Sequence, residues 1–349
     1  MSVSERYELR NASDPIRWNM LVDQSPSGYF SQLWEWGEIQ RSIGWEPWRL
    51  ELLPVDGEGT APIAAAQLLV RKLPGTSWGI ASAPRGPILG RAAEDWARFD
   101  VALIGWAREN HIATLVFDPN VTPDSELGRA MMRSPWKAAP TLGEPRCHVV
   151  DLLAQAELWA NVRRKHREWI RRAERADVEV QWSDGHSSDV DAGVAIGHFL
   201  RVYGELGERI GVPLKGPEYY RLMWDTFRAA GRAQLVTATA GGTPVGAMLH
   251  FTCGNEMIWF AGGQTADGAP LGVGKLLVWR SMLRAGDLGM RRYNMWGTTT
   301  EGLAHFKVGF GAREETYVGT RSMAVNRPAD LAVRAAWRAR QVVRRLRSH

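Results

Sequence analysis

The sequence contains only two cysteines among its 349 residues, Cys147 and Cys253, and they lie far apart without metal-ligand spacing. This scarcity excludes a disulfide-rich secreted scaffold and predicts two buried thiols in a reducing compartment, with no metal site. No apolar run approaches the ~20 residues of a membrane span, and the first residues lack the pattern of a signal peptide. We therefore expect a cytoplasmic protein.

Low-complexity tracts are absent as well, and so are a G-x-S-x-G elbow and a Ser-His-Asp spacing. Charged residues make up 23% of the chain and hydrophobic residues 45%, which is typical of a folded globular protein. The length predicts about two domains.

Acidic residues are too few to balance the basic ones, since 38 Asp and Glu face 43 Lys and Arg and give a net charge of +5. The isoelectric point near 9.4 favours an anionic partner such as nucleic acid, a nucleotide-linked substrate or a membrane surface.

Two arginine clusters carry the excess positive charge. The second of them, at residues 328–349, predicts a basic C-terminal helix that lies on an anionic membrane, binds RNA or docks on the protein.

The first cluster falls in residues 156–177, for which we expect a single helix. Its basic positions are Arg163, Arg164, Lys165, Arg167, Arg171, Arg172 and Arg175. Only Glu168 and Glu174 oppose them, so the positive charges repel one another unless a polyanion is present. Most charge runs are simply solvated helix faces, but here we favour a surface that contacts RNA phosphates.

The order of expected elements repeats along the chain. The first half gives helices at 14–22 and 32–43, a hairpin of strands at 48–53 and 63–71, a strand at 78–83, a helix at 91–110 and a strand at 112–117. The second half gives helices at 189–206 and 217–230, a hairpin of strands at 234–240 and 245–252, a strand at 257–261, a helix at 271–288 and a strand at 292–296. Two α/β halves with mixed sheets fit this order.

A hairpin followed by strand, helix and strand is also the core order of the GNAT acyltransferase fold. In that fold the fourth and fifth strands splay apart, and the acyl donor and acceptor meet in the gap. We expect one GNAT-like subdomain at 1–150, and the basic helix with a second subdomain at 151–327. The predicted C-terminal helix at 328–349 follows them.

One cation in the second half, Lys307, lies between Phe306 and Val308 and follows an expected polar loop at 298–302. A lysine held among apolar neighbours needs an anionic partner, which would be a phosphate, a carboxylate or a developing oxyanion. The alternative is a surface lysine whose stem lies over Phe306.

Short motifs from about residue 25 to residue 319 resemble those of the Fem family (FemA, FemB and FemX). They include S-P-S-G-Y-F-S-Q-L-W-E-W, G-W-E-P, A-P-R-G-P-I-L, F-D-P-N, R-R-A-E-R-A-D-V-E-V, V-P-L-K-G-P-E-Y-Y, I-W-F-A-G-G and H-F-K-V-G-F. Fem proteins are similar to one another in having two GNAT-like subdomains, and they are tRNA-dependent aminoacyltransferases that build the interpeptide bridge of peptidoglycan. The resemblance therefore implies a cytoplasmic role in cell-wall biogenesis and cell shape.

The resemblance implies roles for particular residues. Lys307 is placed at the reacting centre, and Asp118 is placed as a general base, although an Asp-Pro pair after a strand is also an ordinary turn start. The implied substrate contacts are Phe306, Lys215, Tyr219, Phe260, Trp36, Arg41 and Arg85, of which Lys215 and Tyr219 hold the acceptor phosphates. The residues expected to bind tRNA are Arg163, Arg164, Lys165, Arg171 and Arg172.

Two departures from the family concern the acceptor. Phe260 stands where a FemX-type enzyme has a tyrosine, and Glu38 or Gln40 stands where such an enzyme has a lysine for the diphosphate. Arg41 is the candidate replacement for that lysine. The missing charge favours membrane-linked lipid II over UDP-MurNAc-pentapeptide as the acceptor, with peripheral contact at the inner face of the plasma membrane.

The implied reaction is attack by an amine of the stem peptide, or of a bridge residue already added, on the ester carbonyl of aminoacyl-tRNA. It needs alignment, proton loss and oxyanion stabilisation, but no cofactor and no covalent intermediate. One alternative is a CoA-dependent GNAT, because residues 270–275 resemble a pyrophosphate loop, although Ala269 replaces the usual Arg or Gln. The other is a non-catalytic RNA-binding protein on a transferase fold.

Overall fold

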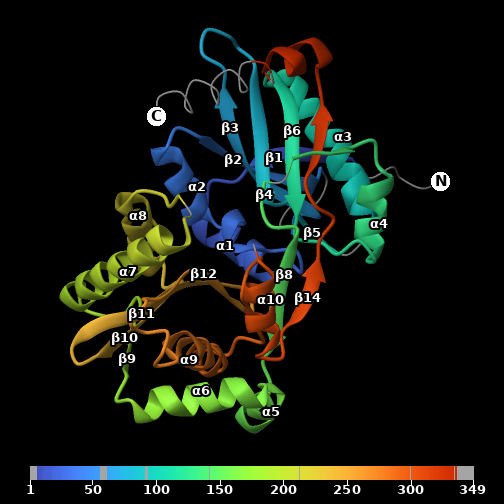
Figure 1. Ribbon diagram of the computed structural model, residues 1–349. Coiled ribbons are helices and arrows are strands. Elements are labelled where there is room, and N and C mark those ends of the chain that lie inside the picture. Colours follow the sequence, from blue (N-terminus) through green and yellow to red (C-terminus); the bar gives the residue numbers. More distant parts are fainter. Residues whose placement is uncertain are drawn as a thin grey trace. The chain divides into compact units, whose positions relative to one another are not determined.

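The computed structural model describes residues 6–55, 61–90, 93–140, 142–211, 213–298, 300–333 and 335. These residues divide into two compact units. The first unit takes its residues from 1–145 and 316–349, and the second unit is 146–315. Each unit has its own sheet (Figure 1) and its own buried core.

The first unit is built on a mixed sheet with strand order β1-β2-β3-β4-β6-β15-β7, and the short β5 pairs with β3. Its strands are β1 (Tyr7–Asn11), β2 (Glu46–Pro54), β3 (Ala64–Lys72), β4 (Gly79–Arg85), β5 (Ile88–Leu89), β6 (Ile112–Pro119), β7 (Lys137–Ala138) and β15 (Arg321–Ala324). Its helices are α1 (Pro15–Gln24), the 3-10 turn η1 (Phe30–Gln32), α2 (Trp34–Ser42), α3 (Ala93–Glu109) and α4 (Glu126–Arg133). Only β4 and β6 form a parallel pair among the strand pairs described.

Alternation along β2 and β3 separates the two faces of this sheet. Leu50 and Leu68 point to one face, where Phe99 of α3 completes a buried apolar cluster. Arg49 and Gln67 point to the other face and donate hydrogen bonds to backbone carbonyls at the start of α2. The polar residues of these strands therefore position α2, while the apolar residues hold α3.

The second unit has a sheet of order β14-β8-β13-β12-β11-β10-β9. Its strands are β8 (Arg146–Asp151), β9 (Glu179–Ser183), β10 (Ala233–Ala240), β11 (Thr243–Cys253), β12 (Glu256–Gln264), β13 (Arg292–Asn294) and β14 (Arg313–Thr316). Its helices are α5 (Gln155–Asn161), α6 (Arg164–Arg175), α7 (Asp189–Ile210), α8 (Pro217–Ala229), α9 (Val273–Asp287) and α10 (Glu301–Val308).

Helices cover both faces of the second sheet (Figure 1). Phe227 of α8 packs on Phe251 of β11 with ring centroids 4.4 Å apart. On the opposite face of β11, Met248 belongs to a buried cluster with Leu277 of α9 and Ile170 of α6. Thus α7 and α8 cover one face, and α9 and α6 cover the other.

The predicted order of helices, hairpin, strand, helix and strand is confirmed in both units. Two segments lie in a different unit from the one that we expected. β15 pairs with β6 and β7 in the first sheet, and residues 316–327 belong to the first unit and not to the second subdomain. β8 pairs with β13 in the second sheet, so the first subdomain does not extend to residue 150. The predicted helix at 328–349 lies largely outside the described residues.

The segment at 156–177 is not a single helix, contrary to our expectation. It consists of α5 and α6, and Val162 and Arg163 between them have extended backbone angles. The Val162 side chain is buried, and the Arg163 backbone N–H donates to the Gly309 carbonyl at 2.9 Å. The Arg163 N–H therefore bonds a carbonyl that is remote in sequence instead of the carbonyl four residues earlier, and the helix is interrupted there.

Candidate functional site

The expected gap between two splayed strands occurs in the second unit and not in the first. In the first unit β4 and β6 stay paired to their ends, up to Arg85 opposite Pro119. In the second unit the pairing of β12 with β13 stops at Ile258 opposite Asn294, while β12 continues to Gln264. A bulge in β12 against β11 leaves Phe260 as the extra residue at this point, and such bulges re-aim side chains beside active sites.

Lys307 lies beside this gap. It is in α10, a helix that our sequence analysis missed, and it is 2% exposed. Its Nζ donates to the carbonyls of Met295 and Gly297 and, at 3.2 Å, to that of Trp296. The ammonium therefore directs its three proton donors at the turn that follows β13.

The turn held by Lys307 is an unusual one. Trp296 has a φ of 64°, a left-handed conformation that is uncommon for a bulky residue, and its N–H donates to the Asn294 side chain at 2.8 Å. The Trp259 ring lies 5.7 Å from Lys307 Nζ, and Phe260 meets the Trp296 ring edge-on at 6.1 Å. A backbone held in this way is a common feature of functional sites.

His148 of β8 is a residue of this site that the sequence analysis did not single out. Its side chain is buried, and burial followed by the charge of Lys307 lowers the pKa of the His148 imidazole. The imidazole is therefore neutral at neutral pH. Its backbone N–H donates to the Trp296 carbonyl at 3.1 Å, so β8 supports the same turn.

The residues that resemble a GNAT pyrophosphate loop start α9, but their amides are already bonded. Gly274 N–H donates to the Gln264 side chain at 2.5 Å, and Val273 N–H donates to the Gly268 carbonyl at 3.2 Å. A Cβ added at Gly272 would lie 2.8 Å from the backbone oxygen of Trp169, because α6 packs against this end of α9. The helix start that holds a pyrophosphate in a CoA enzyme is thus filled by the protein itself.

The expected tRNA-binding residues form an exposed basic face. Arg163, Arg164, Lys165, Arg171 and Arg172 are all exposed. Along this face the guanidinium of Arg172 lies 4.9 Å from the Trp169 ring, and that of Arg171 lies 5.4 Å from the Trp159 ring.

This face is joined directly to the helix that carries Lys307. His166 of α6 hydrogen-bonds the Phe306 carbonyl through Nε2 at 3.0 Å. Gly309 leaves room for that imidazole, since a Cβ there would lie 2.3 Å from Nε2. With the bond from Arg163 to Gly309, two hydrogen bonds connect α6 to α10.

Lys215 and Tyr219 lie at the start of α8. Lys215 is exposed and lines a groove of about 610 Å³ between α7 and α8, together with Tyr203, Glu208 and Tyr220. Tyr219 is half-buried, and its ring meets that of Tyr220 edge-on at 5.5 Å. The groove thus offers one cation and aromatic walls to a ligand.

Asp118 and Arg85 form a buried pair in the first unit. Asp118 is 1% exposed, Arg85 Nε lies 3.8 Å from its Oδ2, and Thr320 donates to its Oδ1 at 3.2 Å. Burial raises the pKa of the Asp118 carboxyl, while Arg85 and Thr320 oppose that rise. Arg85 also lies 4.7 Å from the Tyr317 ring and donates to the Glu144 carbonyl at 2.6 Å. Both expected site residues are therefore enclosed by their own unit.

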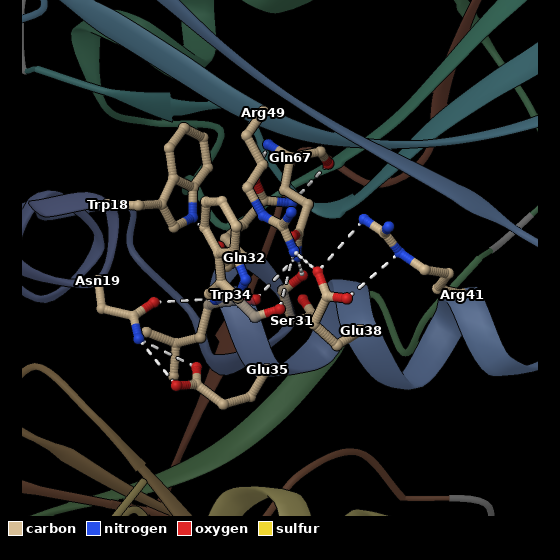
Figure 2. Close-up of polar contacts among 11 residues, drawn as sticks. Trp18, Asn19, Ser31, Gln32, Trp34, Glu35, Glu38, Arg41, Arg49 and Gln67 are labelled. Carbon is tan, nitrogen blue, oxygen red and sulfur yellow. Dashed lines mark hydrogen bonds and ion pairs between the residues drawn. The ribbon is translucent and has the colours of Figure 1, made fainter. Parts of the chain in front are cut away.

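Trp36 and Arg41 lie on α2, which is fixed by the polar network shown in Figure 2. Glu38 accepts from buried Arg49 at 2.9 Å and pairs with exposed Arg41 at 3.2 Å. Glu38, one of the two residues expected at the position of the FemX-type lysine, is thus an acid between two arginines, and Arg41 supplies a cation beside it. Gln40, the other residue, is buried. The Trp36 ring is half-buried and lies edge-on to Phe30 at 5.5 Å.

Comparisons with known proteins agree with this architecture. Residues 160–308 match the acetyltransferase (GNAT) domain family. The fold is similar to that of FemX, with a TM-score of 0.81 and 16% identity over 93% of this chain and 99% of that one. No curated protein matches the chain.

Two further solved structures have a similar fold. One is the C-terminal domain of a putative lysylphosphatidylglycerol synthetase from Agrobacterium fabrum, with a TM-score of 0.52 and 16% identity over 78% of this chain and 85% of that one. The other is a tandem GNAT protein from the clavulanic acid biosynthesis pathway, with a TM-score of 0.50 and 12% identity over 92% and 99%. The chain therefore has the tandem GNAT acyltransferase fold, and its resemblance to the Fem proteins is confirmed for the fold.

Within the described ranges no helix is long and apolar enough to cross a bilayer. In the same ranges no three His, Cys, Asp or Glu side chains gather in a way that could hold a metal ion. Cys147 and Cys253 are both buried, as predicted.

Proposed function

We propose that this protein is a Fem-type aminoacyltransferase, which moves an amino acid from aminoacyl-tRNA to an amine of a peptidoglycan precursor. The observation that carries the proposal is the contact between α6 and α9. There the helix start that would hold the pyrophosphate of CoA is bonded by Gln264 and covered by Trp169. The helix that covers it presents the exposed basic face described above. A filled CoA site beside a surface suited to RNA supports tRNA as the donor.

The proposed reaction takes place at the gap between β12 and β13. The amine attacks the ester carbonyl, a tetrahedral oxyanion forms, and the ribose oxygen leaves with a proton as the amide is made. Lys307 fixes the turn at 295–297, and its charge in a poorly hydrated site favours the developing negative charge.

We assign Asp118 a positioning role in the first unit. A carboxylate with 1% exposure that faces Arg85 and Thr320 is poorly placed to collect a proton from a substrate amine. The amine, whose ordinary pKa is close to that of lysine, can instead lose its proton to water before or during attack.

For the acceptor we propose a stem peptide on lipid II in preference to the UDP-linked precursor. Lys215, which lines the groove between α7 and α8, is the cation that the second unit offers to its phosphates. Glu38 or Gln40 stands where FemX-type enzymes have a lysine, and either residue lowers the positive charge available to a soluble diphosphate.

The test is a transfer assay with purified protein, a set of charged tRNAs and three acceptors: lipid II in liposomes, UDP-MurNAc-pentapeptide and phosphatidylglycerol. We expect a mass increase of one amino-acid residue on lipid II. Transfer only to phosphatidylglycerol would reassign the acceptor, and RNA binding without transfer to any acceptor would support the non-catalytic alternative.

A further inference from the structure

Lys275 is a half-buried cation in the first turn of α9, beside the helix that carries Lys307. Its Nζ lies 5.4 Å from the centre of the Trp169 ring and 5.6 Å from that of the Phe306 ring. In the part of the chain that the structure describes, no carboxylate forms an ion pair with it. Lys275 is thus held between one aromatic ring from α6 and one from α10.

The surroundings of Lys275 are positive. Burial lowers the pKa of its ammonium, and the charge of Lys165 lowers it further. Arg172 approaches the same Trp169 ring at 4.9 Å. Aromatic faces attract a cation but replace only part of the hydration free energy that the cation loses on burial. A bound anion would therefore stabilise the positive charges of Lys275, Lys165 and Arg172.

We propose that Lys275 binds a backbone phosphate close to the 3′ end of the donor tRNA, an inference that rests on the proposed function. The location motivates the choice of the 3′ end, because Phe306, which touches Lys275, directly precedes Lys307 at the reacting site. The amides at the start of α9 are occupied, so the side chain, and not the helix start, is the group that can take the phosphate. The exposed arginines of α6 continue this surface and suit a polyanion.

The experiment compares wild type with Lys275→Met, which keeps the apolar stem between the two rings, and with Lys275→Gln as a second variant in case the first fails to fold. Lys137→Met, at an exposed position in β7, is the matched control. The probes are intact uncharged tRNA and the same tRNA without its last four nucleotides, titrated at several salt concentrations. Transfer from aminoacyl-tRNA is measured in parallel.

We expect Lys275→Met to raise the KM for aminoacyl-tRNA about fivefold to tenfold with kcat within about twofold of wild type. Because the 3′ end of tRNA is single-stranded, loss of one phosphate contact there should reduce the salt slope of tRNA binding by roughly 0.7 in log–log terms. The difference from wild type should vanish with the shortened tRNA, and the control should match wild type throughout.

An unchanged salt slope and KM in a folded variant would overturn the assignment of Lys275. A loss that persists with the shortened tRNA would overturn its location near the 3′ end. If wild type neither binds tRNA nor transfers from it, the proposed function fails first. In that case, binding of inorganic pyrophosphate or acyl-CoA to wild type would be measured. If Lys275→Met weakens that binding, the site belongs to another phosphate ligand.

Discussion

Replacing Lys307 with methionine should weaken both the second unit and the transfer reaction. The substitution keeps much of the stem volume but removes three N–H donors from the turn at 295–297. The Trp296 carbonyl retains the backbone N–H of His148 as a partner. The carbonyls of Met295 and Gly297 each lose the hydrogen bond from Lys307.

The magnitude follows from those two carbonyls. An unsatisfied buried acceptor costs roughly 1–2 kcal/mol when part of the loss is recovered by water, so the variant should lose about 2–4 kcal/mol of unfolding free energy. Removal of a preorganised positive group from a transfer site typically lowers turnover by about a hundredfold to a thousandfold. We therefore expect a folded but less stable protein with a much slower chemical step.

Urea denaturation and single-turnover transfer measure the two effects separately, with Lys137→Met as control. Lys307→Arg should rescue neither, because a planar guanidinium cannot direct donors to three successive carbonyls as a compact ammonium does. Stability within about 0.5 kcal/mol of wild type would refute the reading of Lys307 as the anchor of the turn. A single-turnover rate within about threefold would refute its role in the reaction.

Three further predictions concern other parts of the chain. Burial raises the pKa of the Asp118 carboxyl, so its ionisation destabilises the folded protein as the pH rises above ~3.9. The unfolding free energy of Asp118→Asn should therefore increase relative to that of wild type between pH 4 and 7. A constant or reversed difference in urea titrations would contradict this. Changing Arg171 and Arg172 together to Ala should lower the salt slope of tRNA binding by roughly 1.8, whereas an unchanged slope would mean that these arginines form only a solvated face. Gly309→Ala places a Cβ 2.3 Å from His166 Nε2, so α6 should separate from α10 and hydrogen exchange at the start of α6 should speed up; wild-type exchange rates would show that the contact is dispensable.

Much of the fold could be predicted because periodicity and turn residues recur in both halves. In strands such as 63–71 and 245–252, apolar residues either alternate with polar ones or form a continuous run. The first pattern is typical of half-buried strands and the second of fully buried strands. The tandem GNAT order followed from the repeat itself. The return of β15 to the first sheet could not be predicted. Its four residues show no strand pattern of their own, and they form a strand by pairing with β6.

The candidate site was only partly predictable. The neighbours of Lys307 in the sequence allowed either a desolvated or a surface lysine, and only the resemblance to the Fem family placed it at the reacting centre. Nothing in the sequence indicated that three carbonyls from 295–297 surround the ammonium. The break between α5 and α6 depends on the carbonyl of Gly309, which is remote in sequence. Gln264 fills the start of α9 only because β12 ends beside it. These features arise from long-range contacts, which local patterns do not encode.

Aminoacyl-tRNA, and not acyl-CoA, is the proposed donor. The most direct measurement is transfer of a radiolabelled amino acid to lipid II, with and without RNase treatment of the charged tRNA, alongside a reaction supplied with acetyl-CoA. We expect transfer that RNase abolishes and no acetylation of the acceptor. RNase-resistant transfer from acetyl-CoA would contradict tRNA as the donor, because the start of α9 would then have to release Gln264 and accept a pyrophosphate.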